Sequence, residues 1–378
     1  MRRILILSFF ILLILIPALS QDKFLGGWDK VYGGPKSEKG YGIVKVKDGY
    51  LLVGETTSFG SGGKDIYLLK IDRNGNKIFE KAIGGQKDDY AFSIVEGKEG
   101  YFIVGATRSF GAGNSDVYIV KVREDGEILW RKTYGGKGFE EGWRITKDNE
   151  GKYVVVGRTN SFGNGQYDLY LLKIDEDGNL IWEKAYGREM SEYGYGICAD
   201  NDGYVAVGIT NSFSEGQDVY MVKVDKNGNL LWERVYGGKG YDYAYDVTNC
   251  EDGYLIVGNS NSFSDSVDLY VLKIDKNGGK IWEKTYGGKG YDTGFFVLQD
   301  DNKFLIVGGS NSQGAGNSDV YIVKLDNNGD LLWERYFGGA DLDEGWGLIL
   351  DDGWFVVVGR SESFSTANSE LYVVKFRE

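Results

Sequence analysis

The chain has 378 residues, with 43 lysines and arginines against 56 aspartates and glutamates, and its net charge is −13. Nucleic acid requires clustered basic residues, so an acidic chain of this kind predicts no nucleic-acid partner. Histidine is absent, which excludes histidine general bases, Ser-His-Asp triads and histidine-ligated metal sites.

Residues 1–20 have the pattern of a secretory signal peptide. Arg2 and Arg3 precede an apolar run over residues 4–16, and small residues suited to cleavage follow. The run is shorter than the roughly 20 residues that a membrane span needs. We therefore expect a single domain over residues 21–378, secreted or held at the exterior of the cell envelope, with no stable membrane insertion once the signal is cleaved. Retention of the signal as an anchor is the alternative.

One sequence pattern recurs along the rest of the chain at intervals of 50 to 52 residues. It consists of Asp-x-Tyr, an aliphatic run and a lysine, with Glu in place of Asp in the last copy. A fixed period of this length indicates a solenoid, a propeller or an array. The seven copies begin at Asp65, Asp116, Asp168, Asp218, Asp268, Asp319 and Glu370.

Each repeat contains four short runs rich in Val, Ile, Leu, Tyr and Trp, separated by Gly, Asn, Asp and Ser clusters, which is typical of strands and turns. We name these strands A to D. Asp-Gly turns join A to B, and Asp-x-Asn-Gly turns join C to D as hairpins with a bulge. Four antiparallel strands in each of seven repeats, with no helical pattern, predict an all-β, seven-bladed propeller. In one repeat the strands are residues 244–247, 253–258, 268–274 and 280–286.

The two ends of the repeat region predict how the ring closes. Residues 27–34 (GWDKVYGG) form a lone D strand, and residues 370–376 (ELYVVKF) form a lone C strand. We expect the first to pair with the last and complete blade seven, which removes two exposed sheet edges.

Two aromatic positions recur in every repeat, and both are expected to pack between neighbouring blades. The strand C position is occupied by Tyr67, Tyr118, Tyr170, Tyr220, Tyr270, Tyr321 and Tyr372. The strand D position is occupied by Trp28, Phe79, Trp130, Trp182, Trp232, Trp282 and Trp333.

An acidic residue begins strand A in every repeat. Strand A is the innermost strand of a propeller blade, so these acids are expected near the mouth of the central channel. In one interpretation each carboxylate accepts backbone N–H bonds within its own loop. In the other, the acids converge on the axis and hold protons or a hard cation such as calcium. The acids are Glu38, Asp89, Glu140, Glu192, Asp242, Asp292 and Asp343.

Three residues after each acid stands an aromatic residue, preceded by Gly or Ala in every repeat. The aromatic residues are Tyr41, Phe92, Trp143, Tyr195, Tyr245, Phe295 and Trp346.

Departures from the repeat mark candidate binding residues on the face that carries the longer D–A and B–C loops. Several arginines replace small or neutral residues of other repeats, and a Ser-Phe pair of the B–C loop becomes Ser-Gln in blade six. Scattered sequence drift explains such departures equally well. The candidates are Glu140, Glu141, Trp143, Arg144, Arg158, Arg188, Gln313, Trp346 and Arg360. Two cysteines, Cys198 and Cys250, are expected to be buried thiols, with a bridge between them as the alternative.

The segment KIDKNGGKIW, residues 273–282, resembles the repeat motif of quinoprotein-type propellers. The mature chain also resembles secreted prokaryotic propellers with repeats of the form DGYxxVGxTxSFGxGxxDxYxxKxDxxGNxxW. The first resemblance implies a quinone cofactor and calcium. The vicinal cysteine pair common in those enzymes is missing here.

We therefore expect a non-catalytic propeller that binds a protein, a cell-envelope polymer or a glycan through its long-loop face. No cofactor is expected, with calcium as the exception. The alternatives are a polysaccharide hydrolase or lyase that uses paired carboxylates, or a quinone- or metal-dependent oxidoreductase.

Overall fold

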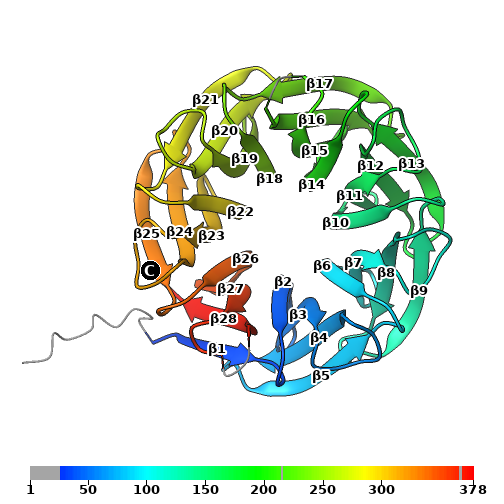
Figure 1. The fold of residues 1–378 in the computed structure, drawn as a ribbon, viewed down its shortest axis with the longest axis vertical. Helices are drawn as coiled ribbons and strands as arrows, with labels where there is room; N and C mark the ends of the chain where they lie inside the picture. The colour runs from blue at the N-terminus through cyan, green and yellow to red at the C-terminus, as the bar shows by residue number, and fades with distance from the viewer. Residues whose placement is uncertain (1–25, 214–215, 366–367) are drawn as a thin grey trace, which may run out of the picture.

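The computed structural model describes residues 26–213, 216–365 and 368–378, and these ranges form seven four-stranded antiparallel sheets around a central axis (Figure 1). The described part of the chain contains strands and turns and no helix. The predicted seven-bladed propeller is thus confirmed. The proposed signal peptide lies outside the described residues, and within them no helix is long and apolar enough to cross a membrane.

Each blade runs from an innermost strand to an outer strand at the rim. Blades one to three are β2 (Glu38–Val46), β3 (Gly49–Thr56), β4 (Asp65–Asp72), β5 (Lys77–Ile83); β6 (Asp89–Glu96), β7 (Tyr101–Thr107), β8 (Asp116–Val122), β9 (Ile128–Tyr134); and β10 (Glu140–Lys147), β11 (Tyr153–Thr159), β12 (Asp168–Ile174), β13 (Leu180–Tyr186). Blades four and five are β14 (Glu192–Ala199), β15 (Gly203–Thr210), β16 (Asp218–Asp225), β17 (Leu230–Tyr236); and β18 (Asp242–Cys250), β19 (Gly253–Ser260), β20 (Asp268–Asp275), β21 (Lys280–Tyr286). Blades six and seven are β22 (Asp292–Asp300), β23 (Lys303–Ser310), β24 (Asp319–Asp326), β25 (Leu331–Phe337); and β26 (Asp343–Asp351), β27 (Trp354–Ser361), β28 (Glu370–Phe376), β1 (Trp28–Tyr32).

Blade seven is built from both ends of the repeat region, as the sequence predicts. Strand β1 pairs antiparallel with β28, from Trp28 opposite Lys375 to Tyr32 opposite Leu371. The Tyr372 hydroxyl donates a hydrogen bond of 2.9 Å to the Asp29 carboxylate. Strand β1 therefore occupies the edge of β28, which protects that edge from pairing with another chain.

The core lies between the blades, where apolar side chains of neighbouring sheets pack face to face. The strand C tyrosines are buried, with at most 2% of their surface exposed. The strand D aromatic residues are only half-buried, but they pack between neighbouring blades as predicted. They lie at the rim, where the Trp28 ring covers Gly75 of the next blade and its indole N–H donates to the Arg73 carbonyl at 3.3 Å. The strand D side chains thus pack where two blades meet and remain partly exposed to solvent.

The two faces of the disc differ in loop length. One face carries loops such as residues 33–37 and 57–64, whereas the other carries turns such as residues 47–48 and 73–76. On the long-loop face, the backbone N–H that begins each innermost strand donates to a carbonyl of the preceding blade, as from Glu38 to Ser369 at 3.0 Å. The bond recurs between every pair of neighbours. On the long-loop face, backbone hydrogen bonds therefore connect each blade to the next.

Cys198 and Cys250 are buried free thiols, which confirms the preferred prediction. Burial raises the pKa of both thiols, most strongly for Cys198. Neither is a reactive thiolate at neutral pH.

Candidate binding site in the central channel

Seven β-bulges shape the wall of the central channel. In each innermost strand the register with the second strand shifts by one residue, as between Gly40 and Gly42 in blade one and between Gly142 and Arg144 in blade three. The residue omitted from the ladder is the recurring aromatic, such as Tyr41 or Trp143. A bulge bends the strand and changes the direction of its side chain, so the seven aromatic side chains turn into the channel. The same shift occurs in the other five blades.

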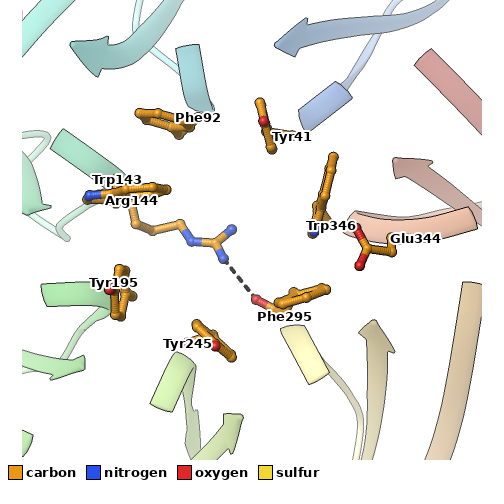
Figure 2. Close-up of a pocket in the computed structure, with 9 residues that line it drawn as sticks. All are labelled: Tyr41, Phe92, Trp143, Arg144, Tyr195, Tyr245, Phe295, Glu344 and Trp346. Atoms are coloured by element: carbon orange, nitrogen blue, oxygen red, sulfur yellow. Dashed lines mark hydrogen bonds between the residues drawn. The ribbon is translucent and has the colours of Figure 1, made fainter. Parts of the chain in front are cut away.

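The seven aromatic side chains form a closed ring around the axis (Figure 2). Each contacts the next, with ring centroids from 4.2 Å apart for Phe92 and Trp143 to 6.2 Å apart for Phe295 and Trp346. The remaining five neighbouring pairs fall between these values. Because aromatic pairs at such distances attract one another by about 0.5–1.5 kcal/mol, the ring is a stable part of the fold.

The aromatic ring encloses a cavity of about 390 Å³, which is lined by all seven aromatic residues together with Arg144 and Glu344. Glu344 precedes Trp346 on β26, on the long-loop side of the ring, so the cavity extends toward that face. Arg144 reaches from blade three into the middle of the ring (Figure 2). Its Nε lies 3.6 Å from the Asp246 carboxylate, and its guanidinium lies 4.8 Å from the centre of the Phe296 ring.

Burial sets the protonation of the groups around the cavity. It raises the pKa of the Tyr41 hydroxyl well above its usual value and that of Tyr195 to about 12. Burial also raises the pKa of the Asp246 carboxyl, an effect that the neighbouring Arg144 charge opposes. The phenols are therefore neutral hydrogen-bonding groups at physiological pH.

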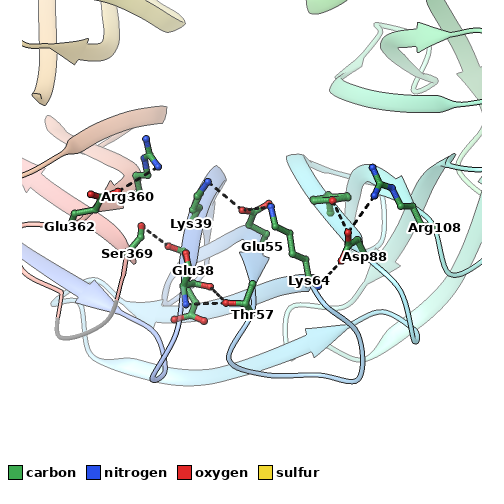
Figure 3. Close-up of polar contacts among 12 residues, drawn as sticks. Glu38, Lys39, Glu55, Thr57, Lys64, Asp88, Arg108, Arg360, Glu362 and Ser369 are labelled. Carbon is green, nitrogen blue, oxygen red and sulfur yellow. Dashed lines mark hydrogen bonds and ion pairs between the residues drawn. The ribbon is translucent and has the colours of Figure 1, made fainter.

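Ion pairs lie near the inner ends of neighbouring blades at the mouth of the channel (Figure 3). Glu55 is buried and pairs with Lys39 at 3.5 Å and with Lys64 at 3.1 Å. In the next blade, Asp88 and Arg108 approach to 3.5 Å. These pairs come from adjacent positions on the two innermost strands and from the loops beside them, so the mouth is polar whereas the cavity wall is apolar.

Blade three also contributes an ion pair to the channel mouth, between Arg158 and Glu141. Arg158 lies opposite Glu141 in the ladder, and their side chains pair at 2.8 Å. The guanidinium also lies 5.0–5.2 Å from the centres of the Phe139, Tyr167 and Tyr193 rings. Burial raises the pKa of Glu141, and the Arg158 charge offsets part of this effect. Arg158 thereby joins the channel mouth of blade three to that of blade four.

The seven acids that begin the innermost strands point into their own blades and not into the channel. All are fully buried. Glu140, for example, accepts hydrogen bonds from the Gly136 backbone N–H at 2.8 Å and from the Thr159 hydroxyl at 2.7 Å. Each acid thus ties the D–A loop to the B–C loop, as in the first interpretation of this pattern. The second needs convergence on the axis, and no group of three or more His, Cys, Asp or Glu side chains in the described ranges is placed to hold a metal ion.

The structure separates the other candidate residues into three groups. Trp143, Arg144 and Trp346 line the cavity. Arg360 is adjacent to it, because it pairs with Glu344 at 3.0 Å and lies 5.3 Å from the centre of the Trp346 ring. Two candidates lie apart from the channel: Arg188 pairs with Glu233 on the outer strand β17, and Gln313 is exposed in the loop after β23.

Sequence reasoning missed Glu344 and Asp246, and of the seven aromatic residues in the ring it named only Trp143 and Trp346 as binding candidates. The ring had a signal, since an aromatic residue follows Gly or Ala at the same position in every repeat. Asp246 had none, because its contact with Arg144 joins residues that are distant in the sequence.

The fold and channel define the class of protein: a seven-bladed β-propeller repeat protein. A family model described as a domain of unknown function (DUF5122) beta-propeller matches residues 150–180 and 299–331. No curated protein matches the chain in sequence.

Solved propellers show the same fold at low sequence identity. The WD40 β-propeller domain of Doa1 is 12% identical with a TM-score of 0.56, covering 93% of this chain and 98% of that one. The Pan2 WD40 domain of Neurospora crassa is 13% identical with a TM-score of 0.51, covering 93% and 96%. A protein of unknown function from Dyadobacter fermentans is 12% identical with a TM-score of 0.51, covering 92% and 97%. Likeness at this level concerns the fold alone.

Proposed function

We propose that this propeller is a secreted, non-catalytic binding protein that holds a protein, a cell-surface polymer or a glycan on its long-loop face. The closed aromatic ring around a cavity of about 390 Å³ is the observation that carries the proposal. Ligand sites are typically concave and mostly apolar, with a few polar groups that orient the ligand. Arg144 and Glu344 are such groups in the cavity, and the ion pairs of the mouth form a polar rim.

The catalytic alternatives receive less support from the cavity lining. A glycosidase of the usual kind needs two carboxyl groups roughly 5–9 Å apart in a cleft. Among the described residues that line the cavity, Glu344 is the only carboxylate, and it is paired with Arg360. A binding role needs no second carboxylate.

Secretion is supported by the pattern of residues 1–20. Expression of the full chain in its host, followed by mass spectrometry of the mature protein, tests this part. A product outside the cytoplasm that begins after residue 20 is expected, and a cytoplasmic product that keeps the apolar run contradicts it.

The binding role is tested by a screen of purified protein against glycans, envelope polymers and envelope proteins. Trp346→Leu changes the cavity wall, whereas Trp354→Leu is the matched control, since Trp354 lies at the start of β27 on the opposite face. We expect binding that Trp346→Leu weakens at least fivefold and that Trp354→Leu preserves. Equal effects of the two substitutions, or turnover of a small substrate without stable binding, contradict the proposal.

A further inference from the structure

Arg144 occupies a position that is small in most other blades. The corresponding residue directly after the bulge is Gly42 in blade one and Gly196 in blade four. A long cation at this point extends across the channel to blades five and six (Figure 2). The repeat itself does not need an arginine here, so its role is specific to the cavity.

Most of the hydrogen-bonding capacity of Arg144 is unused in the described structure. A guanidinium carries five N–H donors. Arg144 makes one hydrogen bond, a long one of 3.4 Å to the Phe295 carbonyl, and its approach to Asp246 is 3.6 Å. The side chain is nevertheless only 17% exposed. A partly buried planar cation with free donors is suited to a carboxylate, which it binds with two parallel hydrogen bonds.

The cavity wall offers further polar atoms beside its apolar rings. Tyr41 and Tyr195 both line the cavity, and burial keeps both of their hydroxyls protonated. A ligand in the cavity can therefore form hydrogen bonds with phenol hydroxyls as well as with the guanidinium. A purely aromatic acid satisfies the guanidinium alone.

Resting on the proposed function, we infer that the cavity binds a sugar acid, with its carboxylate on Arg144 and its ring against the aromatic wall. The C–H face of a pyranose packs on aromatic rings, and its hydroxyls meet the phenols. The volume of about 390 Å³ lies at the lower end of the roughly 300–1,000 Å³ of small-molecule pockets. The net charge of −13 disfavours a long polyanion. The ligand is therefore a free sugar acid or a single uronate at the end of a glycan.

Calorimetry with glucuronate and with glucose isolates the carboxylate, because the two sugars share the same ring. Wild-type protein is expected to bind glucuronate at least tenfold more tightly than glucose, in line with a charged hydrogen bond of about 1.5–3 kcal/mol. Arg144→Gln should remove this preference. The matched control is Arg188→Gln, which removes an arginine paired with Glu233 away from the cavity and should leave binding unchanged.

A second pair of variants covers the case in which Arg144→Gln alone does not fold, because it leaves Asp246 buried beside no cation. Arg144→Gln with Asp246→Asn removes both charges, and the double variant should fold and show no preference for glucuronate. Asp246→Asn alone removes a competing carboxylate but keeps an oxygen for the Val297 N–H, which now donates to Asp246 at 3.1 Å. It should tighten glucuronate binding severalfold.

The outcomes separate this inference from the broader proposal. Glucuronate binding that is unaffected by Arg144→Gln, or weakened by Asp246→Asn, overturns the sugar-acid site. Equal affinity for glucose and glucuronate does the same. If the cavity instead binds a neutral glycan or a protein, the inference fails while the binding function stands. If neither the sugars nor the wider screen yields a ligand, both fail.

Discussion

The hydroxyls of the strand C tyrosines provide a matched pair of stability variants. Tyr270 is fully buried, and its hydroxyl donates a hydrogen bond of 2.7 Å to Glu283 on the neighbouring strand. Tyr118 is equally buried, but Arg131 replaces the glutamate at this point of blade two, and the Tyr118 hydroxyl has no hydrogen-bond acceptor in the described structure. Substitution by phenylalanine removes the same atom in two different environments.

We expect Tyr270→Phe to destabilise the fold by about 1.5 kcal/mol, the lower end for a charged hydrogen bond. The lower end applies because Glu283 is 25% exposed and water can replace the lost donor. Tyr118→Phe removes a buried hydroxyl without an acceptor and should change stability by roughly zero, or increase it slightly.

Thermal unfolding followed by circular dichroism measures the difference. With an unfolding entropy of about 2.1 cal/mol/K per residue, about 350 folded residues give about 0.7 kcal/mol/K, so Tyr270→Phe should lower the midpoint by about 2 °C. Tyr118→Phe should not lower it. If Tyr118→Phe loses as much stability as Tyr270→Phe, the hydrogen bond to the glutamate is not what stabilises this position.

Three further perturbations test the seams between blades. Burial raises the pKa of Asp351, but its contacts with Lys45 and Tyr50 outweigh that effect and hold the pKa below its usual value. The resulting stabilisation is present above about pH 4 and is lost as the pH falls through the lowered pKa. Asp351→Asn should therefore flatten the acid side of a profile of unfolding free energy in urea against pH. An unchanged profile would contradict this. Gly75→Ala should lower the free energy of unfolding in urea by at least about 1 kcal/mol more than Gly151→Ala does. Both glycines have φ near +70°, but only the new Cβ at position 75 meets a tryptophan ring. Equal losses would show that backbone strain alone matters. Deletion of β1 should expose the edge of β28, lower the melting temperature and promote self-association in size-exclusion chromatography; a monomer of unchanged stability would show that this strand does not close the ring.

The sequence predicts the blades well because local turn chemistry and a long-range period agree. Asp-Gly and Asp-x-Asn-Gly turns define the hairpins, and seven copies of one unit define the ring. The lone strand at Trp28 and its partner at Tyr372 follow from the same alignment, and the structure pairs them.

The channel was harder to predict, because a single bulge decides which side chain faces it. The regular alternation of side chains along a strand does not predict the direction of a bulged residue that is left out of the β-sheet pairing. Glu140 therefore looked like a channel residue but points to Thr159, whose recurring hydroxyl two residues before Ser161 was its sequence signal. Contacts such as Arg144 with Asp246 depend on the curvature of the whole ring and have no local signal.

The bulges separate the residues that build the propeller from those that line its central channel. Because each bulged side chain lies outside the backbone ladder, its replacement alters one segment of the channel lining without disturbing strand pairing. Seven such positions, one per blade, lie on a constant scaffold, and a substitution at one of them also changes its contacts with the two neighbouring rings. Engineering a new specificity in this molecule therefore begins with these seven codons, before any loop is redesigned.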